Sequence, residues 1–393
     1  MSIASEITRL QNAKAALKSS IEAKGVTVPQ DAKIDTYAEL IDSIPTGSKE
    51  YEPICFASLE DGNTFKLNKE ISISVDGKKT WQTLKADTNS PVINTGEKIY
   101  FRATENASPF AGTTDDYYQF TTAKTCNVSG HPYSLYAKFS SYFFGNLFNG
   151  TKVVDASDLT LDADIVSNGC YFSMFEGCTS LTTAPELPAT TLANSCYNAM
   201  FRNCTSLVTA PELPATTLAN YCYFSMFEGC TSLTTAPELP ATTLADGCYF
   251  SMFYGCTSLT TAPELPATTL AYGCYFSMFS GCTSLTTAPE LPATTLADSC
   301  YVSMFSGCTS LTTAPELPAT TLADGCYFSM FYGCTKLNYI KCLATDISAT
   351  NCTRSWLLYV ASTGTFVKAA EMEDWLVGDD GRPSGWTVVN DNA

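Results

Sequence analysis

The stretch CYFSMFYGCTSLTTAPELPATTLAYG, residues 248–273, is one copy of a unit that occurs seven times between Cys170 and Asn351. Each copy is 26 residues long, and a second cysteine follows the first after eight residues. A fixed repeat of this length is typical of a solenoid, in which each unit buries its apolar side chains only against its neighbours. The sequence therefore predicts a stack of near-identical coils.

The pattern inside one unit predicts how each coil is built. The segment 259–262 is short, β-branched and followed by Pro263, which favours one short strand per coil. Stacked copies would form a parallel sheet with a spacing of roughly 4.8 Å. The segment 248–253 has no proline, so we expect one or two helical turns on the opposite side of the coil, and Gly255 then reverses the chain.

The run Met-Phe-x-Gly-Cys-Thr-Ser-Leu, followed by Leu-Pro and by a leucine before the next cysteine, resembles the leucine-rich repeats of the BspA-like type found in surface proteins of gut Bacteroidales. The resemblance covers about half of the chain. The Pro-Glu pair, Pro185-Glu186 in the first copy, makes this unit longer than the usual repeat of that family. The resemblance implies a leucine-rich-repeat solenoid that binds a partner and does not catalyse a reaction.

Differences between the copies concentrate at two places, and these are the candidate ligand contacts. One place lies two residues before the second cysteine and the other is the pair of residues before the first cysteine. The first set comprises Glu176, Arg202, Glu228, Tyr254, Ser280, Ser306 and Tyr332, and the second comprises Asn194, Asn220, Tyr221, Asp246, Tyr272, Asp298 and Asp324. Stacked coils would turn each set into a surface column that mixes aromatic, charged and small polar side chains, a composition suited to binding. Alternatively, exposed positions simply tolerate change.

Two constant columns have simpler interpretations. The glutamates at 186, 212, 238, 264, 290 and 316 would stack as like charges, either as a cation-binding row or as a solvated acidic edge, and the latter is favoured because water screens them. Fourteen of the 18 cysteines lie in the repeats at constant spacing, which gives rows and not the clusters that zinc requires. We expect buried free thiols that fill small apolar spaces.

The N-terminal segment predicts two helices, the first over residues 2–24. Ile3, Ile7, Leu10, Leu17 and Ile21 follow heptad spacing with Lys14 at the missing position, and a second helix is expected at about 33–43. The order of motifs in residues 2–44, from Ser-Ile-Ala-Ser-Glu-Ile-Thr-Arg-Leu to Tyr-Ala-Glu-Leu-Ile-Asp-Ser-Ile, looks like the N-terminal segment of tail and fibre proteins from phages of gut bacteria. That resemblance implies attachment to the virion at this end. The first residues lack the basic start and apolar middle of a signal peptide, which agrees with assembly in the host cytoplasm.

The predicted fold class is mixed: an N-terminal helical hairpin, a small β-sandwich, and a leucine-rich-repeat solenoid with stacked parallel strands. The predicted domains are an attachment or oligomerisation segment (1–47), the β-sandwich (50–140), the solenoid with a degenerate first copy (141–352) and a C-terminal cap (353–393). The β-sandwich is expected from six short strand patterns between residues 51 and 122. An apolar lid is expected from Phe366, Trp375, Leu376 and Trp386.

Composition and missing motifs narrow the function. A formal charge of −17 argues against nucleic acid and anionic membrane partners, and no stretch has the length of a membrane span. The single histidine, His131, leaves little room for metal or Ser-His-Asp chemistry. We therefore predict a non-enzyme without cofactor or metal: a virion tail protein and homo-oligomer, held by other tail proteins through residues 1–47, that contacts a host surface glycan or protein through its repeats. A bacterial BspA-like adhesin and a structural virion spacer are the alternatives.

Overall fold

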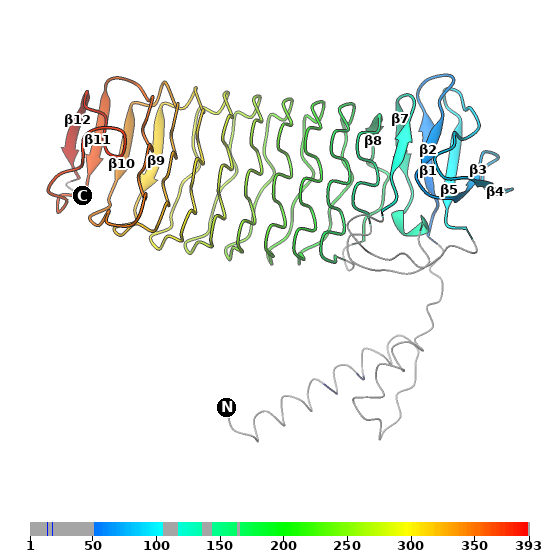
Figure 1. Cartoon of the computed structure of the whole chain (residues 1–393), viewed down its shortest axis with the longest axis horizontal. Helices are drawn as coiled ribbons and strands as arrows, with labels where there is room; N and C mark the ends of the chain where they lie inside the picture. Colours follow the sequence, from blue (N-terminus) through cyan, green and yellow to red (C-terminus); the bar gives the residue numbers. More distant parts are fainter. Residues whose placement is uncertain are drawn as a thin grey trace. The chain divides into compact units, whose positions relative to one another are not determined.

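The computed structural model describes residues 51–104, 117–135, 144–162 and 166–391, together with Lys14 and Lys18. The chain divides into two compact units, Met1–Tyr51 and Glu52–Ala393. In the second unit the repeats form a β-solenoid, whose coils stand side by side between strands β8 (Val153–Asp155) and β9 (Thr313–Leu317), as Figure 1 shows. The predicted stack of coils is confirmed.

One side of each coil is a continuous series of β-turns, which we call the turn run. At the start of the repeat quoted above it spans 246–256, and so includes the last two residues of the preceding repeat. Its backbone N–H groups alternate between two kinds of acceptor. Phe250 and Tyr254 donate to the carbonyl three residues earlier in their own coil, at 3.2 and 3.1 Å. Ser251 and Phe253 donate to carbonyls of the next coil, at 2.7 and 2.9 Å. Backbone hydrogen bonds therefore hold adjacent coils together along this side.

Every fourth residue of the turn run has a left-handed backbone. Gly247, Ser251 and Gly255 have φ values of 56°, 52° and 69°. Each is the third residue of a tight turn, where a positive φ favours glycine because glycine has no Cβ to clash. The residues just before them carry the side chains that reach the surface of this side: Asp246, Phe250 and Tyr254.

The opposite side of the coil is a sheet with few backbone hydrogen bonds. The strand predicted at 259–262 is reduced to a parallel bridge at Thr261, which joins it to Thr235 and Thr287. Proline has no N–H, so the Ala-Pro-Glu-Leu-Pro segment cannot complete a ladder. One repeat after Pro315 the sequence has Lys341, and there β9 and β10 (Tyr339–Cys342) pair as parallel strands, with one shift of register between Tyr339 and Lys341.

Aromatic rings and thiols fill the interior of the coils. Tyr249 stacks on Tyr275 of the next coil with ring centroids 5.8 Å apart, and the same contact recurs along the column. The second cysteine of each repeat donates its S–H to a carbonyl of the preceding coil, as Cys256 does to Phe227 at 3.1 Å. All 18 cysteines are buried free thiols, in agreement with the prediction that they are unpaired.

The N-terminal end of the solenoid is continuous with a β-sheet. The strands before the repeats are β1 (Ile54–Ser58), β2 (Phe65–Leu67), β3 (Ile71–Ser74), β4 (Gln82–Leu84), β5 (Lys98–Arg102), β6 (Phe120–Thr122) and β7 (Cys126–Ser129). They form a two-stranded sheet, β2-β6, and a six-stranded sheet in the order β4-β3-β5-β1-β7-β8. Because β7 pairs in parallel with β8, and Asp155 of β8 bridges Thr183, the larger sheet leads directly into the first coil.

The C-terminal end is closed by four parallel strands and by tryptophans. The sheet has the order β12-β11-β10-β9, where β11 is Gly364–Lys368 and β12 is Trp386–Asn390. Trp356 stacks between Tyr327 and Trp375, with centroid distances of 6.1 and 5.4 Å. Of the predicted lid residues, Leu376 is 66 % exposed and does not belong to the buried cluster.

The predicted mixed fold class is wrong in its helical part. In the residues that the structure describes there is no α-helical element, and the short 3-10 helix η2 (Pro132–Leu135) is the one helical segment with defined bounds. The predicted hairpin helices at 2–24 and 33–43 lie outside the described residues except for Lys14 and Lys18, two isolated helical positions. The helical turns expected at 248–253 are also absent, because alternate N–H groups bond to the next coil and an i→i−4 ladder cannot form.

Candidate functional site

The solvent-facing side of the turn runs, which we call the turn face, carries three columns of side chains, one from each position before a left-handed residue. The entry column contains Asn194, Asn220, Asp246, Tyr272, Asp298 and Asp324. The middle column contains Phe172, Asn198, Phe224, Phe250, Phe276, Val302 and Phe328. The exit column contains Glu176, Arg202, Glu228, Tyr254, Ser280, Ser306 and Tyr332. The fold therefore brings both predicted variable columns onto one face.

The entry column is exposed throughout, and part of its composition has a structural cause. Asp246 Oδ1 accepts a hydrogen bond from the backbone N–H of Tyr272 in the next coil at 3.2 Å, and Asp298 accepts from Asp324 in the same way. Asparagine and aspartate side chains thus connect adjacent coils. Tyr272 cannot do this, since its ring has no acceptor at that position, and it is 56 % exposed.

The residues of the exit column differ in how accessible they are to a ligand. Arg202 donates from Nε to Glu176 Oε1 at 2.8 Å, so these two predicted contact residues neutralise each other. Ser280 is only 9 % exposed and offers little surface to a ligand. Tyr254 is 45 % exposed, and Tyr332 is 38 % exposed and meets Tyr359 edge to face at 5.2 Å. The tyrosines are therefore the accessible large side chains of this column.

The middle column was missed by the sequence reasoning, which did not recognise the period of four within the turn run. Its phenylalanines are half-buried, and those of three successive coils stack on one another. Phe250 lies 4.8 Å from Phe224 and 4.3 Å from Phe276, with interplanar angles of 19° and 6°. These rings form a rigid aromatic ridge between the entry and exit columns.

Tyr221 completes an aromatic group on the turn face. It occupies the left-handed position that is glycine in several other repeats, with φ of 56°, and it is 40 % exposed. Its ring meets Phe224 edge to face at 6.1 Å and covers Gly247, where an added Cβ would lie 2.4 Å from Tyr221 Cε1. A tyrosine in this backbone region is strained, and such strain is concentrated at functional sites.

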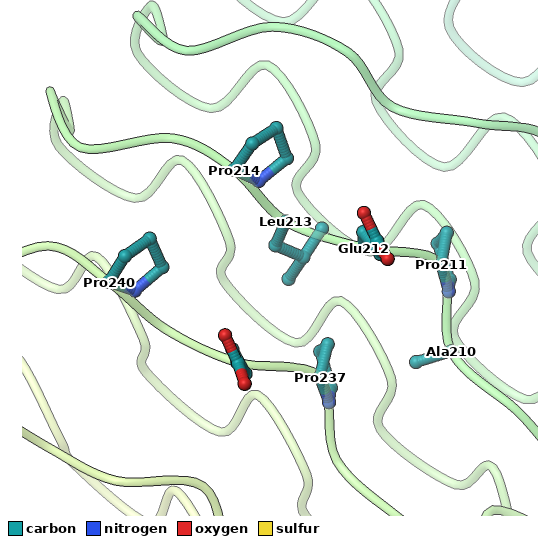
Figure 2. Close-up of a pocket in the computed structure, with 8 residues that line it drawn as sticks. Ala210, Pro211, Glu212, Leu213, Pro214, Pro237 and Pro240 are labelled. Carbon is teal, nitrogen blue, oxygen red and sulfur yellow. The ribbon is translucent and has the colours of Figure 1, made fainter.

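The sheet side offers a second repeated feature. Grooves of about 400 and 360 Å³ lie between adjacent Ala-Pro-Glu-Leu-Pro segments, at 210–214 with 237–240 and at 262–266 with 289–292. Figure 2 shows Glu212 between Pro211 and Pro214, beside Pro237 and Pro240 of the next coil. The glutamates of this column are exposed, and Glu316 pairs with Lys341 at 3.3 Å. The Pro-Glu-Leu-Pro sequence that lines these grooves is the same in six copies, whereas the residues of the turn face vary.

The remaining chemistry of the described residues is sparse. His131 is 6 % exposed and lies 3.2 Å from Asp162, so the predicted lone histidine has a carboxylate partner. Among the residues that the structure describes, no three or more His, Cys, Asp or Glu side chains are grouped so as to hold a metal ion.

Burial raises the pKa of the Cys230 and Cys282 thiols to about 12, which keeps them protonated at neutral pH.

No protein-family model, no curated protein and no solved structure matches this chain. Within its described part, no helix has the length and apolar character needed to cross a membrane. The fold by itself defines the class: a β-solenoid of stacked parallel coils with an aromatic and acidic turn face.

Proposed function

We propose that this chain is a non-enzymatic phage tail appendage, a fibre or receptor-binding protein, which attaches to the virion through residues 1–47 and contacts the host surface through the turn face. The attachment end is inferred from the sequence of residues 2–44, which looks like that of phage tail and fibre proteins. Several copies presented on one particle would multiply many weak contacts. An adhesin of the BspA-like type would use the same face from a bacterial surface.

One observation carries the binding role. The repeats vary at the residues whose side chains reach solvent on the turn face, whereas the sheet side keeps Pro-Glu-Leu-Pro in six copies. If exposure alone allowed change, the exposed glutamates of the sheet side would vary as well, and they do not. The contrast between two exposed sides favours a turn face that is adapted to a ligand over a spacer with neutral surfaces.

Antibody labelling of purified phage particles tests the location. We expect the antibody to label the tail of the intact particle. An antibody against the repeats should bind at a distance from the end of the chain that is attached to the virion. Particles without label, combined with label on the surface of bacterial cells, would replace the phage proposal by the adhesin.

Adsorption measurements test the binding role. Phage that carry Tyr254→Ser and Tyr272→Asp, residues that other copies have in the same columns, should adsorb to host cells more slowly than the parent phage. Tyr339→Thr is the matched control, because Tyr339 is an exposed tyrosine of the sheet side that pairs with Thr313 of the preceding coil. Equal adsorption of all three phages would favour the spacer.

A further inference from the structure

The turn face concentrates its exposed aromatic side chains in neighbouring coils. Tyr221, Asp246 and Tyr272 lie on three successive coils and are linked by two hydrogen bonds. The Tyr221 N–H donates to the backbone carbonyl of Asp246 at 2.9 Å, and the Tyr272 N–H donates to Oδ1 of the Asp246 side chain at 3.2 Å. Phe224, Phe250 and Phe276 fill the middle column of these three coils. Tyr254 stands in the exit column of the coil that carries Asp246. Three successive coils thus present exposed tyrosines on the same face as the exposed Asp246 carboxylate.

The backbone that carries these side chains is held in place before any ligand arrives. The backbone of each belongs to the alternating hydrogen bonds of the turn run, and the Phe224, Phe250 and Phe276 rings brace one another. Tyrosine loses little conformational freedom on binding and presents a large amphipathic surface. A surface of this kind is preorganised, and preorganisation lowers the entropic cost of binding.

The charges of the face select among ligands. The acidic side chains near the aromatic cluster are Glu228, Asp246 and Asp298, whereas the basic Arg202 is already paired with Glu176. A carboxylate accepts hydrogen bonds and donates none, so the ligand must supply donors without bringing negative charge. A chain with a net charge of −17 also repels anionic polymers.

We infer that the turn face around Tyr221, Asp246, Tyr254 and Tyr272 binds a neutral polysaccharide of the host surface, laid along the stack of coils. Sugar rings offer apolar C–H faces to the tyrosines and hydroxyl donors to the carboxylates, which is the combination that this face can satisfy. Tyr221 and Tyr272 belong to coils two steps apart, roughly 10 Å at the usual strand spacing, so one extended glycan chain can meet both rings. The inference rests on the proposed function and specifies its ligand.

Cell binding by the purified full-length protein separates the two claims. The labelled protein is added to a panel of gut bacterial strains, and a strain that binds it is then treated either with periodate, which cleaves vicinal diols of sugars, or with protease. We expect periodate to abolish binding and protease to leave it. Loss of binding with protease alone would overturn the glycan inference but leave a host-surface function standing. Binding to no strain would remove both.

Affinity electrophoresis tests the class of glycan and the residues. Gels contain a neutral polysaccharide (mannan, dextran or laminarin) or an anionic one (alginate or heparin). We expect a neutral polysaccharide to retard the wild-type chain, and the Tyr254→Ser/Tyr272→Asp variant to lose affinity by at least about tenfold. The Tyr339→Thr control should keep it. Stronger retardation by the anionic gels, no retardation in any neutral gel, or equal behaviour of wild type and double variant contradicts the inference. Circular dichroism confirms that each variant is folded.

Discussion

At the scale of single residues, cysteine does more in this solenoid than fill space. The second cysteine of each repeat is fully buried and gives its S–H to a phenylalanine carbonyl of the preceding coil, 3.1 Å away for Cys256 and Phe227. The first cysteine, such as Cys248, is equally buried, but within the described residues this column has one thiol–carbonyl contact between coils, a long one of 3.9 Å from Cys326 to Cys352 in the next coil. The two cysteine columns have the same spacing in the sequence, but only the second makes a regular series of thiol–carbonyl hydrogen bonds between coils.

Replacing one thiol in each column tests this difference. Cys256→Ala should lower the free energy of unfolding by about 1–2 kcal/mol, because it leaves a small cavity and removes a hydrogen bond between coils. Cys248→Ala creates a cavity of the same kind but removes no such hydrogen bond, so it should lower the free energy of unfolding by less. Thermal unfolding of the two variants under reducing conditions measures the difference. Equal losses would mean that the thiol–carbonyl contact does not contribute to stability.

At the scale of the element, the turn run depends on its left-handed residues. An added Cβ at Gly255 meets no atom within 4 Å, so a substitution there is limited by its φ of 69° alone. Asn203 occupies the equivalent position with φ of 60°. Asparagine tolerates this region better than other residues that have a Cβ.

Two substitutions at Gly255 should therefore lower the free energy of unfolding by different amounts. Gly255→Ala is expected to cost about 1 kcal/mol, the usual penalty for a Cβ in the left-handed region. Gly255→Asn should cost clearly less, as the natural residue in the second repeat suggests. Urea unfolding followed by circular dichroism reports both values. A larger loss for asparagine than for alanine would show that side-chain crowding, and not backbone conformation, limits this position.

At the scale of the whole molecule, each coil is in contact with the two beside it, so complete repeats are interchangeable units. Deleting residues 248–273 removes one period, together with Tyr254 and Tyr272. Deleting residues 300–325 also removes one period, but the exposed residues that it takes from the turn face include no aromatic side chain. Both deletions join equivalent positions and preserve the stacking register.

We expect both shortened proteins to fold, with circular dichroism spectra like that of the full chain. Only the 248–273 deletion should lose binding to host cells, since the other keeps the aromatic cluster. Deleting 248–260, half a period, should prevent folding because the buried columns no longer align. If the 300–325 deletion also fails to bind, the length of the face matters more than its tyrosines.

The buried thiols also predict an alkaline limit to stability. Burial raises the pKa of Cys222, Cys230, Cys274, Cys282 and Cys334 from 9.0 to about 12. Between these values the unfolded chain has released protons that the folded chain keeps, so the free energy of unfolding falls as pH rises from about 9 to 12. Below pH 9 these thiols add no slope. Urea midpoints across the range measure the effect, and a flat profile between pH 9 and 12 would show that the thiols are solvated.

The sequence by itself determined that the chain stacks coils, since a 26-residue period with invariant leucines and cysteines leaves each unit no other way to bury them. It also located Glu176, Tyr254, Tyr272 and the other variable residues, because copies of one unit can be compared within one chain. It failed on the turn run, where the absence of proline suggested a helix. Local propensity cannot show that alternate N–H groups of 247–255 bond to the next coil.

Only the tertiary structure decided which side chains reach solvent and which face they share. The left-handed residues every four positions turn Asp246, Phe250 and Tyr254 outward, and thereby add the phenylalanine column that the sequence comparison missed. Stacking also showed that Ser280 is covered and that Arg202 is engaged by Glu176. The physical reason is that exposure and pairing depend on the adjacent coil, which lies 26 residues away in sequence and in direct contact in space.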